Sequence, residues 1–111
     1  MDDRMMLTLQ PSAGNDDYLN LGRTIAAQCP QGFAEARLEA ELAEDGGELR
    51  ILCTPEGEEE REVDVDAVAQ LRIVQMLRHI RRQMTGEDEA PWNRCIVTLR
   101  KGGHFRMDVG V

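Results

Sequence analysis

The sequence predicts an α+β fold, a two-layer sandwich in which two helices cover one face of an antiparallel sheet. Three observations predict it. Two segments carry apolar residues at helical spacing, several strand-like segments alternate apolar and polar residues, and Gly-containing turns join neighbouring strand-like segments. Along the chain the elements follow the order α-β-β-β-α-β-β, which is typical of helices packed on one sheet face. The length of 111 residues suits a single domain, residues 1–111.

Residues 16–29 are predicted to form the first helix. Leu21 and Ile25 lie one turn apart on its apolar side, and Pro30 ends it because proline cannot continue a helix. The preceding arm, residues 1–15, shows no clear periodicity of apolar residues, although its run MMLTL has the composition of a short edge strand. We expect part of this arm to be loose.

The segment at residues 33–45 is the hardest to assign. Ala, Glu and Leu favour helices, yet small or apolar residues alternate strictly with charged ones. A helix would place only alanines beside Leu38 and Leu42, whereas a period of two is typical of a half-buried strand. We therefore predict a strand, an Asp-Gly-Gly turn at residues 45–47 and a return strand over residues 48–53.

A third strand of the same meander is predicted after an acidic turn. Residues 54–60, TPEGEEE, form that turn, and residues 61–66 alternate again. This alternation places Val63 and Val65 on the inward side.

The second helix is predicted over residues 67–84, with Asp66 as its N-cap. Cationic side chains near its C-terminus suit the helix dipole. The residues expected on its apolar stripe are Val68, Leu71, Val74, Leu77, Ile80 and Met84, widened by Ile73 and Met76.

The last two strands are predicted at residues 92–100 and 104–111, joined by a Lys-Gly-Gly turn at residues 101–103. Trp92 opens the first of them and is expected to cover one edge of the core. The alternative role of Trp92 is to anchor an interface with a partner.

Composition limits the function classes. The net charge of −8 disfavours binding to nucleic acid or to an anionic membrane surface, because both carry negative charge. No signal peptide or membrane span is visible. The three cysteines form no CxxC pair, and their odd number predicts reduced thiols in a reducing compartment. The cytoplasm is therefore the expected location.

No arrangement typical of catalysis or metal binding stands out. His79 and His104 have no ligand spacing to each other, and the cysteines do not complete a zinc set. Cys95 and His104 could meet across the last hairpin as a hydrolase pair. Period two instead places Cys95 on the inward face, where a thiol is usually inert packing. We expect no enzyme, no catalytic residue, no metal and no cofactor.

Charge is segregated along the chain. Up to Asp66 there are 17 acids and 5 bases, a net of −12, and from Ala67 onward 4 acids and 8 bases, a net of +4. The acids can be a solvated face, or a recognition surface for a basic partner. The candidate partner-binding residues are Glu39, Glu41, Glu56, Glu58, Glu59 and Glu60.

The closing segment, PWNRCIVTLRKGGHFRMDVGV, resembles the end of the YezG-like immunity family. The positions that match its pattern are Trp92, Asn93, Gly102, Phe105 and Asp108. The resemblance implies a small cytoplasmic α+β protein that neutralises a cognate bacterial toxin, typically a nuclease, by one-to-one association. The alternative is a small interaction subunit of another complex, with the Cys/His hydrolase ranked below it.

Overall fold

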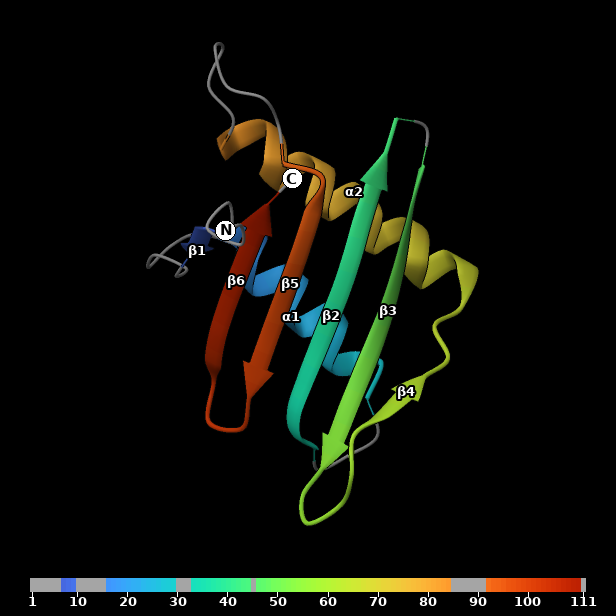
Figure 1. The fold of residues 1–111 in the computed structure, drawn as a ribbon, viewed down its shortest axis with the longest axis vertical. Helices are drawn as coiled ribbons and strands as arrows, with labels where there is room; N and C mark the ends of the chain where they lie inside the picture. The colour runs from blue at the N-terminus through green and yellow to red at the C-terminus, as the bar shows by residue number, and fades with distance from the viewer. Residues whose placement is uncertain (1–6, 10–15, 30–32, 45, 85–91, 111) are drawn as a thin grey trace.

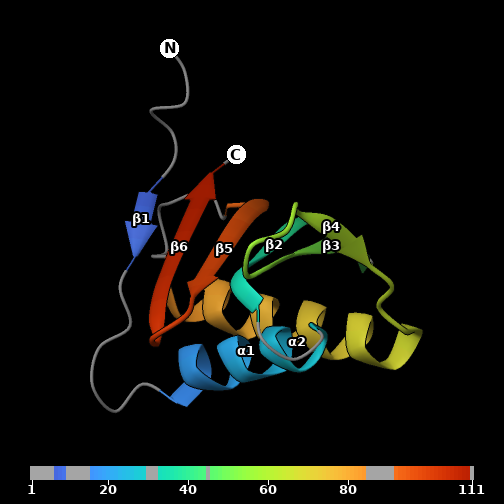
Figure 2. The same cartoon turned by 90° about the horizontal axis from the view of Figure 1, so that it is seen from below.

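The computed structural model describes residues 7–9, 16–29, 33–44, 46–84 and 92–110. It has two layers, a six-stranded antiparallel sheet and two helices that lie on one face of that sheet (Figures 1 and 2). The predicted α+β fold is confirmed. The elements are β1 (Leu7–Leu9), α1 (Asp16–Ala27), β2 (Phe33–Ala43), β3 (Gly46–Pro55), β4 (Arg61–Val63), α2 (Ala67–Met84), β5 (Arg94–Arg100) and β6 (His104–Gly110).

The sheet has the strand order β1-β6-β5-β2-β3-β4. The predicted meander of β2, β3 and β4 is present, and so is the β5–β6 hairpin with Gly102 and Gly103 at positive φ in its turn. Helix α2 carries the chain from the β4 edge to β5 in the middle of the sheet, where β5 pairs with β2. The run MMLTL contributes β1, which pairs with β6 as an edge strand.

β2 is a strand, as its period of two predicts. Ala36, Leu38, Ala40 and Leu42 are buried, while the charged residues between them are half-buried or exposed. β3 and β5 pair with the backbone of β2 on either side, and the apolar residues of β2 join the core, so the helix propensity of Ala and Glu is overridden. We call the side of the sheet away from the helices the outer face.

The predicted place of the first hairpin turn is wrong by two residues. Ala43 pairs with Gly46 and Leu42 with Gly47, so both glycines belong to β3, and the connection lies between Ala43 and Gly46. Gly47 is required for close approach, because a Cβ atom there would lie 3.0 Å from the carbonyl oxygen of Glu41. Asp45 lies outside the described residues.

Helix α2 has the predicted bounds and the predicted cap, with the Ala69 N–H donating to Asp66 Oδ1 over 2.8 Å. Its predicted stripe is wrong at the N-terminal end, where Val68 is 68% exposed and Leu71 59% exposed. Figure 2 gives the reason, since the first turns of α2 extend past β4 and have no sheet above them. The buried residues of the stripe are Ile73, Val74, Leu77 and Ile80.

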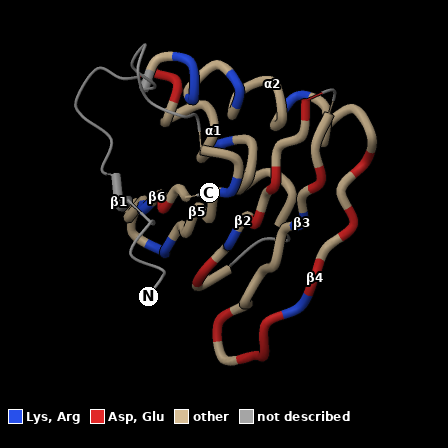
Figure 3. Tube along the Cα trace, turned by 45° about the horizontal axis from the view of Figure 1, so that its top comes forward, with Lys and Arg blue, Asp and Glu red and all other residues tan. Residues whose placement is uncertain are grey.

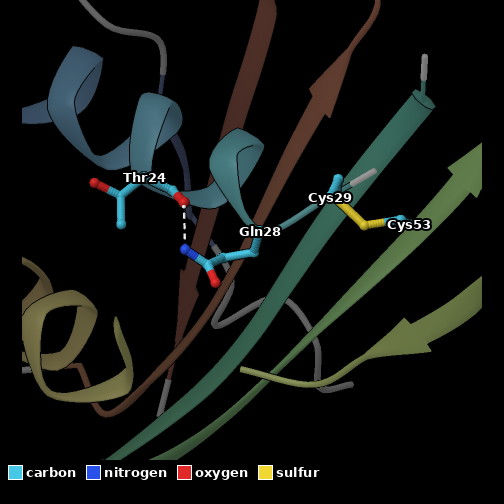
Figure 4. The surroundings of a disulfide bond; sticks show 4 residues. All are labelled: Thr24, Gln28, Cys29 and Cys53. Carbon is cyan, nitrogen blue, oxygen red and sulfur yellow. Dashed lines mark hydrogen bonds between the residues drawn. A yellow bond between two sulfur atoms is a disulfide. The ribbon is translucent and has the colours of Figure 1, made fainter. Parts of the chain in front are cut away.

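The prediction of three reduced cysteines is wrong for two of them. Cys29, which follows α1, forms a disulfide with Cys53 in β3 (Figure 4). The apolar side of α1 packs against the sheet, and this packing carries Cys29 to the inner side of β3. The disulfide therefore connects the two layers. Cys95 is a free thiol and is buried.

Neither described helix combines the length and the apolar character that crossing a membrane requires.

Candidate protein-binding surface

The candidate acids occupy two neighbouring regions. Glu39 and Glu41 lie on the outer face of β2, whereas the other four lie in the connection between β3 and β4, which we call the acidic turn, residues 56–60. Figure 3 shows acidic positions gathered along this connection and on β2 and β3. The acidic turn closes with the Glu58 N–H donating to the Pro55 carbonyl, and Gly57 takes a φ of 76°.

Most of the acidic turn is neutralised within the chain. Glu56 forms an ion pair with Lys101 of the β5–β6 turn over 3.0 Å, and Glu58 pairs with Arg61. Glu60 pairs with Arg37 of β2 over 3.2 Å. Glu59 alone among the turn's four acids has no cationic partner in the described part of the chain. The turn therefore presents less free negative charge than its composition suggests.

A row of ion pairs also crosses the outer face. Glu39 accepts a hydrogen bond from Arg50 of β3 over 2.9 Å, and Arg50 lies 3.9 Å from Glu62. The hydrogen bond to Glu39, followed by its charge, raises the pKa of the exposed Arg50 guanidinium. On the other side of Glu39, the Arg37 Nε lies 2.9 Å away, although the buried Nε is not aligned for a hydrogen bond. The carboxylate of Glu39 is thus satisfied from both sides.

Two carboxylates on the same face are not satisfied. Glu41 of β2 stands directly opposite Glu48 of β3, and both side chains are exposed. Like charges in this position destabilise a sheet. Arg94 is opposite Glu41 on β5, but no ion pair joins them, and neither acid has a cationic partner among the residues that the structure describes. Glu48 is not among the acids predicted from the sequence, although the alternation of β3 places it on the same face as Arg50.

A shallow hollow lies over these residues. It is lined mainly by residues of β2, β3 and β5, and its lining has more carboxylates than guanidinium groups. The lining residues are Glu39, Ala40, Glu41, Glu48, Leu49, Arg50, Glu62, Arg94, Cys95 and Ile96. The hollow therefore suits a cationic group.

The hairpin keeps Cys95 and His104 apart. Cys95 pairs with Val109 and is buried on the inner face, while His104 pairs with Arg100 and is exposed. Burial, with a smaller effect from Asp108, raises the pKa of the Cys95 thiol to about 12. The two side chains cannot act as a nucleophile and base, because they lie five pairing positions apart on opposite faces. Cys95 shares the inner face with Val97 and Leu99, as period two predicts.

In the described ranges there is no group of three or more His, Cys, Asp and Glu that could hold a metal ion. Two arginines near the end of α2 bind the backbone of other elements. Arg78 donates to the carbonyls of Ala43 and Gly46 over 2.5 and 2.7 Å. Arg81 donates to the carbonyl of Trp92. Burial lowers the pKa of Arg81, and the charge of the nearby Arg78 lowers it further.

Trp92 is buried and packs against the core, as predicted.

No protein-family model matches the chain, and no curated protein matches it at a significant level. The resemblance to the YezG-like immunity family therefore stays a prediction.

Proposed function

We propose that this chain is a protein-binding module that neutralises a basic partner by one-to-one association through the outer face of its sheet. The single observation that carries this proposal is the facing pair Glu41 and Glu48, two exposed carboxylates without a cationic partner in the described chain. Such a pair costs folding stability. A partner's Lys or Arg placed between the two carboxylates would remove that cost and add charge complementarity.

The partner class follows from this charge. A nuclease must hold phosphate groups and therefore carries a basic surface, which an acidic inhibitor can occupy. Inhibition of a nuclease toxin is also the activity that the family resemblance implies, because members of that family are bacterial immunity proteins. The proposed contacts are Glu41, Glu48 and Glu59, because Glu39, Glu56, Glu58 and Glu60 already have partners within the chain.

The proposed cytoplasmic location needs its own test. It was predicted partly from unpaired thiols, and the Cys29–Cys53 disulfide removes that argument, since disulfides persist mainly in oxidising compartments. Rapid alkylation of intact cells, followed by mass measurement of the chain, reports which form is present. A reduced pair supports the cytoplasm, and an oxidised pair contradicts it.

The association is tested with the protein encoded directly upstream of this chain's gene. We expect the two to co-purify at low salt and the complex to weaken as salt is raised. Glu48→Lys should slow association by about tenfold at low salt, because it reverses charge on the proposed surface. The matched control is Gln75→Lys with Gln83→Lys, which gives the same net-charge change on exposed positions of α2. Equal slowing by both variants, or no association at all, contradicts the proposal.

A second candidate is an interaction subunit that docks through α2. It is favoured by the exposure of Val68 and Leu71, two large apolar side chains on neighbouring turns. The two candidates are separated by Leu71→Lys, which should disrupt the complex only if α2 is the docking element.

A further inference from the structure

Strand β3 is longer than its outer neighbour. It spans Gly46–Pro55, but β4 pairs only with Ile51–Cys53. Within the described ranges, Gly46–Arg50 therefore pairs with β2 on one side and with no strand on the other. Figure 1 shows this part of β3 at the edge of the sheet, above the level of β4.

The open segment has the geometry that accepts another strand. The pairing of β2 with β3 is regular from Ala36 to Ala43, and its only register shift lies at the far end, between Phe33 and Glu35. A regular edge presents backbone N–H and C=O groups that can pair with an extended chain. Arg78 already binds the carbonyl of Gly46, so the available edge is Gly47–Arg50. β4 already pairs with this same edge further along.

The side chains of this edge select what can bind there. On the outer face, Glu48 is exposed and unpaired within the described chain, and a basic side chain opposite it would form a favourable cross-strand pair. On the inner face, Leu49 is half-buried against the core, and an apolar side chain beside it would complete its burial. A second copy of this chain fits less well, because it carries a net charge of −8 and the same exposed Glu48.

We infer that the partner of the proposed function binds by adding one extended strand to β3 at Gly47–Arg50. This strand places Lys or Arg beside Glu48 and an apolar residue beside Leu49. The inference rests on the proposed function for the class of partner, and it adds where the partner binds and through which backbone geometry. Backbone hydrogen bonds supply affinity in this mode, while alternate side chains supply specificity.

The probe is a short, end-blocked peptide of alternating Lys and Val, titrated into isotope-labelled protein and followed by NMR. We expect shift changes concentrated on the amides of Gly47–Arg50, together with slower amide hydrogen exchange there. Methylating every second backbone nitrogen of the peptide removes its hydrogen-bond donors along one edge. This should weaken peptide binding by about tenfold or more, since at least two backbone hydrogen bonds between the peptide and β3 are lost.

Matched variants locate the contact. Glu48→Lys should weaken peptide binding by roughly threefold to fivefold, whereas Glu44→Lys, an exposed acid at the hairpin end, should change it little. Shift changes confined to the acidic turn, binding insensitive to N-methylation, or no binding overturn strand addition. In the complex with the upstream gene product, unchanged exchange at Gly47–Arg50 also overturns it but leaves the proposed function standing. Failure of that complex to form contradicts the proposed function itself.

Discussion

Cys29, just beyond the end of α1, is bonded to Cys53 in β3, and their Cα atoms lie 6.0 Å apart. Cys53 is fully buried beside the core, whereas Cys29 is half-buried near the helix end, where Gln28 Nε2 donates to the Thr24 carbonyl (Figure 4). The disulfide is a covalent cross-link between the helix layer and the sheet. It closes a segment with a sequence separation of 24, which contains the entry into β2 and the first hairpin.

We expect Cys29→Ala to lower the free energy of unfolding by about 3 kcal/mol, because the bond restricts the unfolded chain over this segment. The measurement is denaturant unfolding without reductant. Adding reductant should destabilise the wild-type chain by a similar amount and leave Cys29→Ala unchanged. If reductant has no effect on the wild-type chain, the disulfide does not stabilise the fold.

Arg78 connects α2 to the β2–β3 hairpin by donating to the carbonyls of Ala43 and Gly46, the two residues that flank the hairpin turn. We expect Arg78→Ala to lower the free energy of unfolding by about 1–2 kcal/mol, because two charge-assisted hydrogen bonds are lost at a partly solvated site. Arg82→Ala is the matched control, since Arg82 is exposed on the same helix end. It should change stability by less than about 0.5 kcal/mol. Equal effects would contradict a specific role for Arg78.

The local periods of the sequence predict most elements of this fold. Strict alternation identifies β2 against the helix propensity of its residues, and Asp66 predicts where α2 begins. The buried side of α2 could not be predicted fully, because Val68 and Leu71 follow the same spacing as Leu77. Only the position of the sheet edge, which is a long-range property, decides that they stay exposed.

The candidate surface was predicted only in part, for a similar reason. Composition identifies an acidic half, but whether a carboxylate is free depends on which cation the sheet places beside it. Glu60 pairs with Arg37 of β2, which is 23 residues away in sequence, and Glu39 pairs with Arg50 of the neighbouring strand β3. Glu48, by contrast, has no cationic partner in the described part of the chain, because the register places it opposite Glu41, whereas Arg50 of the same strand is opposite Glu39.

The two glycines that open β3 offer a matched pair of substitutions. A Cβ atom at Gly47 would lie 3.0 Å from the Glu41 carbonyl oxygen, whereas one at Gly46 would meet nothing within 4 Å. Neither has a positive φ. We expect Gly47→Ala to destabilise the fold by about 1–2 kcal/mol through overpacking, and Gly46→Ala to be neutral or slightly stabilising. Thermal unfolding of both variants tests this, and the reverse ranking would contradict the hairpin register.

Burial of Cys95 predicts how stability responds to alkaline pH. Its folded-state pKa is raised from 9.0 to about 12, so the folded chain keeps a proton that the unfolded chain loses above pH 9. Folding stability from this group is therefore complete below pH 9 and falls as pH rises from 9 towards 12. The slope is at most about 1.4 kcal/mol per pH unit.

The measurement is denaturant unfolding across that pH window, with Cys95→Ser as the control that lacks the titrating thiol. The wild-type chain should lose stability more steeply than the variant. At neutral pH a thiol reagent should label Cys95 only after unfolding, because the folded thiol is protonated and buried. Rapid labelling of the folded chain, or identical pH slopes for both proteins, would show that Cys95 is accessible and would reverse its assignment as a packing residue.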